Sequence, residues 1–120
     1  MSIDTLAFRV DELEVDGVDV FVLSGEFDAY SLPMLGDRLD AAIERGLYEM
    51  VIDMCDVEFV DMSTLNRIVR AMKEIYRHNG HLVIACGSRN VLRAIDLAGL
   101  RHAVKVFDSR DDAVAALRRP

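Results

Sequence analysis

The fold of this chain is decided by one stretch, Met50-Val51-Ile52-Asp53-Met54-Cys55-Asp56-Val57-Glu58-Phe59-Val60-Asp61-Met62-Ser63-Thr64-Leu65. Its first part, residues 50–54, is a continuous apolar run around one carboxylate, which is typical of a β-strand covered on both faces. We expect a break at Cys55-Asp56, after which residues 57–60 continue the strand. At Asp61 the spacing of the apolar residues changes from that of a strand to that of a helix. A buried strand leading directly into an amphipathic helix is a unit of α/β folds.

The helix that begins after Asp61 is long and has two distinct faces. Asn79-Gly80 ends it, because both residues tolerate the left-handed conformation that closes a helix. We expect one face to pack in the core and the other to be solvated. The apolar face consists of Leu65, Ile68, Val69, Met72, Ile75 and Tyr76, and the solvated face consists of Arg67, Arg70, Lys73, Glu74 and Arg77.

Before this stretch, the sequence predicts a β-hairpin followed by a loop. Apolar residues alternate over residues 8–15 and again over residues 18–22. Asp16-Gly17 lies between the two runs and favours the positive φ angles of a tight hairpin turn. Residues 24–28 then predict a loop.

A helix follows this loop. Ser31 is a candidate N-cap, and Pro33 is tolerated in the first helical turn. Gly46 ends the helix. Its inward face is predicted to consist of Leu32, Leu35, Leu39, Ala42 and Ile43.

Two further strand–helix pairs follow residue 80. Strands are predicted at residues 82–86 and 104–107. Each is followed by a predicted helix, and the candidate N-caps of these helices are Ser88 and Ser109. The complete order is β-β-α-β-α-β-α-β-α, and repeated β-α-β crossings favour a mostly parallel sheet. We therefore predict a single α/β domain over residues 1–120, with a mixed sheet, an N-terminal β-hairpin and amphipathic helices. Inward residues of the last two helices are predicted to be Val91, Leu92, Ile95, Ala98, Ala113, Val114 and Leu117.

Composition narrows the classes of function. The chain has 120 residues, 52% of them hydrophobic, and a net charge of -7. The acidic balance argues against nucleic acid and against an anionic membrane surface as partners. No apolar run is long enough to insert in a membrane, and the N-terminus lacks a secretory signal, so we expect a cytoplasmic protein. Cys55 and Cys86 are predicted to be buried thiols.

The charge is unevenly distributed along the chain. Residues 1–61 carry 16 acidic and 3 basic side chains, whereas residues 62–120 carry 5 acidic and 11 basic ones. Such asymmetry indicates either oriented docking on a partner or simply a solvated surface.

The motifs of common enzymes are missing from the sequence. It has no phosphate-binding glycine loop, no H-E-x-x-H, no G-x-S-x-G and no C-x-x-C, and His78, His81 and His102 lack the spacing of metal ligands. We predict no catalytic residue, no metal and no cofactor, and therefore a protein that is not an enzyme.

The junction Asp61-Met62-Ser63-Thr64 is the remaining candidate site. One interpretation is ordinary N-capping, in which the Asp61 carboxylate accepts a hydrogen bond from a first-turn N–H. The other is a phosphorylation switch, because a hydroxyl in an exposed first turn lies where the helix dipole favours an added phosphate.

Three segments resemble one known family, the STAS-domain anti-sigma factor antagonists. Residues 51–65 are similar to its signature V-I-D-L-x-x-V-x-F-I-D-S-S/T-G-L. Gly25-Glu26-Phe27-Asp28 resembles its G-E-L-D, and residues 90–100 resemble its P-x-V-x-R-x-L-x-L-x-G-L helix. The resemblance covers nearly the whole chain and implies a STAS-like fold.

The resemblance also implies a function. Antagonists of this family bind a GHKL-type serine kinase that acts as an anti-sigma factor, and binding releases the sigma factor. The kinase phosphorylates the antagonist on the first hydroxyl after the aspartate, and a serine phosphatase reverses the modification. By this resemblance, Asp28, Asp61, Met62, Ser63 and Thr64 lie at or near the docking edge.

This chain departs from the family at the acceptor position, where Met62 has no hydroxyl. One alternative is that the switch has moved to Ser63, with Thr64 as the alternative acceptor. Another is that the switch has been lost and the domain docks constitutively. A further alternative is a STAS branch without the switch, namely a non-phosphorylated docking subunit of a lipid-transport ABC complex or of a stressosome-like assembly.

Overall fold

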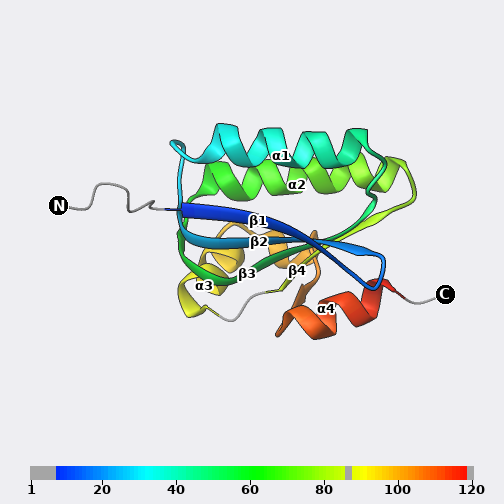
Figure 1. Cartoon of the computed structure of the whole chain (residues 1–120). Coiled ribbons are helices and arrows are strands. Elements are labelled where there is room, and N and C mark those ends of the chain that lie inside the picture. The colour runs from blue at the N-terminus through cyan, green and yellow to red at the C-terminus, as the bar shows by residue number, and fades with distance from the viewer. Residues whose placement is uncertain (1–7, 86–87, 119–120) are drawn as a thin grey trace.

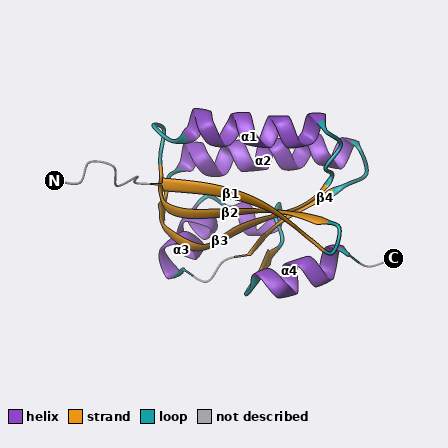
Figure 2. Cartoon of the chain, in the orientation of Figure 1, coloured by secondary structure: helices purple, strands orange, loops and turns teal. Residues whose placement is uncertain are grey.

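A computed structural model describes residues 8–85 and 88–118, and its elements follow the predicted order (Figures 1 and 2). One 3-10 turn, Leu100–His102, was not predicted. The strands are β1 (Phe8–Val15), β2 (Val18–Phe27), β3 (Glu49–Val60), β4 (His81–Ala85) and β5 (Val106–Phe107). The helices are α1 (Leu32–Glu44), α2 (Met62–Arg77), α3 (Arg89–Leu97) and α4 (Arg110–Leu117).

The five strands form one sheet in the order β1-β2-β3-β4-β5. β1 and β2 are antiparallel, and every other neighbouring pair is parallel, which confirms the mixed, mostly parallel α/β sheet. The hairpin turn is formed by Asp16 and Gly17, with φ angles of 53° and 82°. The Asp-Gly signal was therefore correct, because both central positions of this turn require positive φ.

Helices cover both faces of the sheet, but unequally. α1 and α2 lie side by side above the strands in Figure 1, and α4 lies below them. The larger core unites residues of α1, α2 and α3 with one face of the sheet, including Phe21, Leu39, Ile52, Ile68 and Ile95. The smaller core lies between the opposite face and α4, and includes Val20, Val51, Val83, Ala113 and Val114.

β2 is longer than the sequence predicts. The expected loop at residues 24–28 is wrong, since the strand continues to Phe27. Glu26 pairs with Phe59 and Phe27 pairs with Val60. Pairing with β3 thus keeps this polar, glycine-containing segment extended.

β3 is continuous from Glu49 to Val60, so the expected break at Cys55-Asp56 is also wrong. The register between β2 and β3 shifts twice, and at each shift β3 contains one residue more than β2, as in a β-bulge. Burial then recurs every third residue, at Met54, Val57 and Val60, with exposed pairs between them. Cys55 is consequently exposed rather than buried, and Cys86 lies outside the described residues.

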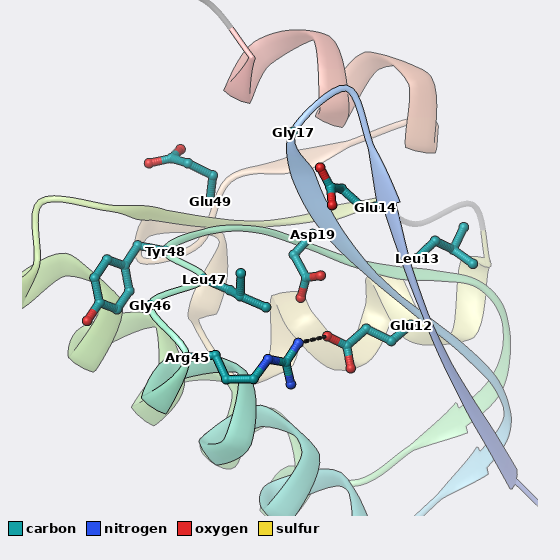
Figure 3. Close-up of a pocket in the computed structure, with 10 residues that line it drawn as sticks. All are labelled: Glu12, Leu13, Glu14, Gly17, Asp19, Arg45, Gly46, Leu47, Tyr48 and Glu49. Carbon is teal, nitrogen blue, oxygen red and sulfur yellow. Dashed lines mark hydrogen bonds and ion pairs between the residues drawn. The ribbon is translucent and has the colours of Figure 1, made fainter.

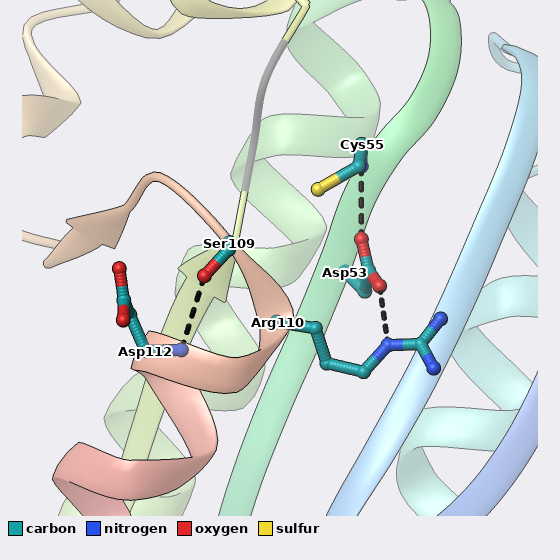
Figure 4. Close-up of polar contacts among 5 residues, drawn as sticks. All are labelled: Asp53, Cys55, Ser109, Arg110 and Asp112. Carbon is teal, nitrogen blue, oxygen red and sulfur yellow. Dashed lines mark hydrogen bonds and ion pairs between the residues drawn. The ribbon is translucent and has the colours of Figure 1, made fainter.

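Asp53 connects β3 to α4 (Figure 4). Its Oδ2 accepts a 2.7 Å hydrogen bond from Arg110 Nε, and its Oδ1 accepts one of 2.9 Å from the Cys55 N–H. Burial raises the pKa of the Asp53 carboxyl, but these hydrogen bonds outweigh burial and hold the pKa below its usual value. α4 itself begins with the predicted cap, in which Ser109 Oγ accepts a hydrogen bond from the Asp112 N–H.

α2 buries the expected apolar stripe, with two departures. Tyr76 was predicted to face inward but is 47% exposed. Arg67 was predicted to be solvated, yet its side chain is only 10% exposed. It reaches across to α1, where its Nη2 donates to the Gly36 carbonyl oxygen at 3.1 Å and pairs with the Asp40 carboxylate at 2.5 Å. The buried residues of α2 are Thr64, Leu65, Ile68, Ala71, Met72 and Ile75.

Candidate functional site: the docking edge

The segments predicted to form the docking edge lie together at the carboxyl ends of β2 and β3. Phe27 and Val60 pair at these ends, and the Asp61 N–H donates to the Phe27 carbonyl oxygen at 3.0 Å. The loop at Asp28 and the start of α2 are therefore neighbours (Figure 1). We use docking edge for residues 26–31 together with residues 58–64.

Asp61 organises the start of α2. Its Oδ1 accepts three hydrogen bonds, from Ser63 Oγ at 2.8 Å, from the Thr64 N–H at 3.0 Å and from Thr64 Oγ1 at 3.0 Å. Partial burial raises the pKa of the Asp61 carboxyl, but the hydrogen bonds from Thr64, Ser63 and the Ala29 N–H outweigh it, and the pKa is lowered. Asp61 is therefore ionised at neutral pH. It caps α2, as the N-capping interpretation of the sequence predicted.

The three residues after Asp61 differ sharply in accessibility. Met62 is exposed, with 49% of its surface accessible. Ser63 is half-buried, whereas Thr64 is completely buried. The sequence predicted both hydroxyls in an exposed turn, and for Thr64 this is wrong, because its side chain is enclosed and its hydroxyl donates to Asp61.

Asp28 holds the neighbouring loop through its side chain. Its Oδ1 accepts hydrogen bonds from the Tyr30 N–H at 2.9 Å and from the Ser31 N–H at 3.3 Å. Ser31 occupies the predicted N-cap position of α1 but makes no side-chain cap bond. Its hydroxyl instead bonds the backbone of Asp28, accepting from the N–H and donating to the carbonyl oxygen. The loop is thus fixed by its own side chains, while Asp28 stays exposed.

Two large exposed side chains at this edge were not predicted as site residues. Tyr30 is 88% exposed and Phe59 is 50% exposed. Phe59 faces solvent because of the second bulge in β3, which an alternating pattern does not reveal. Tyr30 sits one residue before the candidate cap, in a position where an aromatic side chain has no core to enter. Together with Met62 they give the docking edge an apolar component, and Glu26 and Glu58 are exposed among them.

Over residues 8–85 and 88–118, no group of three or more His, Cys, Asp or Glu side chains is arranged to hold a metal ion. Within the same residues, no helix has the length and apolar character needed to cross a membrane.

This fold and this edge define a STAS domain. Residues 9–113 match the STAS domain model, and the chain belongs to that family. It is 26% identical over 102 residues to an anti-sigma-B factor antagonist of Listeria monocytogenes, covering 84% of this chain and 88% of the relative. It is 29% identical over 102 residues to an anti-sigma F factor antagonist of Paenibacillus polymyxa, covering 84% and 87% of the two chains. The crystal structure of an anti-sigma factor antagonist from Mycobacterium paratuberculosis superposes with a TM-score of 0.87 at 25% identity, covering 98% of both chains.

Proposed function

We propose that this chain is an anti-sigma factor antagonist that acts by binding rather than by catalysis. Its docking edge binds a GHKL-type anti-sigma factor in the cytoplasm and thereby releases a sigma factor. The observation that carries the proposal is the start of α2, where an ionised cap, a half-buried hydroxyl and an exposed apolar side chain follow one another. The similarity to anti-sigma factor antagonists over more than four fifths of the chain supports it.

The chemistry of the edge suits a protein partner. Aromatic side chains and methionine contribute much of the binding energy of protein interfaces, because they bury large apolar areas at little entropic cost. Phe59 and Met62, each about half exposed, are placed to do so. The carboxylates of Glu26, Asp28 and Glu58 steer a basic partner surface, which makes association faster at low salt.

Ser63 is the proposed phosphoacceptor. The Ser63 side chain is half-buried, whereas that of Thr64, the alternative acceptor, is completely enclosed. Both hydroxyls donate to Asp61, so accessibility is what separates the two candidates. In the reaction, the γ-phosphoryl group of ATP forms a bond to Ser63 Oγ, its bond to the ADP oxygen breaks, and the hydroxyl proton passes to a base of the kinase. A serine phosphatase would hydrolyse the same bond and restore the hydroxyl.

Phosphorylation would act on the complex more than on the fold. A phosphate carries a charge of about -1.5 to -2 and, on Ser63, would stand beside the Asp61 carboxylate. Phosphorylation would remove the hydrogen bond that Ser63 Oγ donates to Asp61, but both bonds from Thr64 to Asp61 would remain, so α2 keeps its cap. In the complex, the phosphate would lie against the apolar contact that Met62 and Phe59 make. There its volume and the cost of desolvating its charge outweigh attraction to a basic partner surface, and the complex dissociates.

The test is phosphate mapping by mass spectrometry after incubation with the GHKL-type kinase encoded in the same genome and ATP. We expect one phosphate, on Ser63, and none in Ser63→Ala. Phosphate on Thr64 in the folded protein would contradict the assignment. An active kinase that binds the chain but adds no phosphate would favour constitutive docking, the alternative left open by Met62.

Binding tests the docking edge separately. Asp28→Lys should weaken association with the anti-sigma factor, whereas Glu44→Lys, an equal charge reversal at the far end of α1, should not. Equal affinities of the two variants would place the interface elsewhere. Stable binding to an ABC transporter ATPase instead of the anti-sigma factor would favour the transporter-subunit alternative.

A further inference from the structure

A second candidate site lies at the end of the sheet opposite the docking edge. It is a pocket of about 580 Å³ between the β1–β2 hairpin and the loop that joins α1 to β3 (Figure 3). Glu12, Glu14 and Asp19 line it from the hairpin, and Arg45 lines it from the end of α1. None of these residues belongs to the proposed docking edge, so the pocket is separate from it.

The pocket has an excess of negative charge. Arg45 Nη2 bonds Glu12 Oε2 at 3.1 Å, and this pair neutralises one carboxylate of the three. Glu14, directly opposite Asp19 in the hairpin, is exposed. At the rim, Glu49 is occupied by His81, whose Nδ1 lies 3.1 Å from Glu49 Oε1.

Asp19 is the unusual residue of the pocket. It is only 8% exposed, and its Oδ2 is buried without a hydrogen-bond partner among the described residues. Figure 3 shows its carboxyl directed toward the ion pair of Glu12 and Arg45. Burial raises the pKa of Asp19 to about 7. The charge of Glu12, a hydrogen bond to Glu12 that only the protonated Asp19 can donate, and the charge of Glu14 add to the rise, and the Arg45 guanidinium opposes it. A buried acceptor without a donor is unfavourable, and a ligand with N–H groups would supply the donor.

We propose that this pocket binds a cationic nitrogen group, an alkylammonium or a guanidinium, which donates hydrogen bonds to Asp19 and is attracted by Glu12 and Glu14. An anion is disfavoured by the carboxylates. A metal ion is disfavoured because no group of three suitable ligands is brought together among the described residues. An ammonium group fits, since it needs only acceptors and charge and the pocket has room for the alkyl chain that carries it.

Binding of the cation competes with a proton on the Asp19 carboxyl. The cation binds the ionised carboxylate, so apparent affinity should rise about tenfold from pH 6 to pH 8 and level off above the pKa. The amine itself stays protonated throughout this range, because its pKa lies well above 8. Neutralising Asp19 should remove both the binding and its pH dependence.

The experiment is a titration of the isotope-labelled full chain, followed by NMR of the backbone amides, with diaminobutane as the probe. The uncharged butanediol of the same length is the matched probe control. A short glycine peptide with one central lysine forms a second arm, because the cation could be a free amine or a partner's side chain. Tighter binding of diaminobutane indicates a free ligand, and tighter binding of the peptide indicates a protein partner.

We expect saturable shifts at Gly17, Asp19 and Gly46 with the cationic probes and none with butanediol. The isosteric Asp19→Asn should lose at least about tenfold in affinity, and Glu12→Gln should weaken binding less. Asp37→Asn removes one exposed carboxylate of α1 outside the pocket and should bind as the parent chain does. Equal affinity in Asp19→Asn and Asp37→Asn, or no shift with either cationic probe while the spectra show a folded protein, would overturn the proposal.

Discussion

Replacing Arg67 by alanine should destabilise the domain, although helical spacing alone places this residue on a solvated face. The guanidinium donates to the Gly36 carbonyl oxygen at 3.1 Å, and a hydrogen bond from a charged donor contributes about 1.5–3 kcal/mol to the free energy of unfolding. The ion pair with Asp40 adds at most about 1 kcal/mol, because the Asp40 side chain is 58% exposed. We therefore expect Arg67→Ala to cost roughly 1.5–4 kcal/mol.

Urea unfolding at pH 7, followed by circular dichroism, measures this difference. Arg70→Ala is the matched control, since Arg70 is the same residue type on the same helix but is exposed, and its loss should stay within about 0.5 kcal/mol. Arg67→Lys should fall between them, because it keeps the charge but not the planar fork. Equal free energies of unfolding for Arg67→Ala and Arg70→Ala would show that the contacts of Arg67 with α1 do not stabilise the domain.

Three further predictions concern other contacts. Arg110→Ala should lower the free energy of unfolding by roughly 1–3 kcal/mol at pH 7, because it leaves the buried Asp53 carboxylate without its charged partner. Since the pKa of Asp53 is lowered in the folded protein, this stabilisation is present above about pH 4 and is lost as the pH falls through the folded pKa. The melting temperatures of the variant and the parent should therefore converge in acid. Asp19 has the opposite pH dependence, because its pKa is raised to about 7: its contribution to stability is present in acid and is lost as the pH rises through 7. The melting temperature of Asp19→Asn should therefore rise relative to that of the parent between pH 5 and pH 8, and a constant difference over this range would contradict this. Phe59→Ser should leave the melting temperature unchanged but weaken binding to the anti-sigma factor about tenfold by calorimetry, with Leu97→Ser, an equally apolar but unrelated exposed site, as the control.

The elements predicted best are those fixed by local chemistry. Asp16-Gly17 predicted the hairpin turn because few other residue pairs accept positive φ at both positions. α2 was predicted because its apolar spacing persists over four turns and Asp61 provides a cap that is complete within three residues. Such signals need no knowledge of the rest of the chain.

The features that were missed depend on partners distant in sequence. The bulges that expose Phe59 arise from the register between β3 and β2, and no local pattern encodes them. Arg67 can pack against α1 because residue 36 is glycine: a Cβ added there would lie 3.0 Å from Arg67 Nε. Asp19 lies in the alternating pattern of a strand, and its burial beside Arg45 and Leu47, which are distant in sequence, is not visible in that pattern. The sequence predicted that Asp28 and the start of α2 lie together and that Met62 is exposed there, but it did not predict the exposure of Phe59 and Tyr30.

The most direct test of the proposed function is displacement of a sigma factor. A fluorescently labelled sigma factor bound to its GHKL-type anti-sigma factor is titrated with this chain, and release is followed as a fall in anisotropy. We predict release by the parent chain and by Ser63→Ala, and loss of release by Asp28→Lys and by the chain carrying phosphate on Ser63. Failure of the unphosphorylated parent to release any sigma factor from an anti-sigma factor it binds, or equal release after phosphorylation of Ser63, would contradict the account.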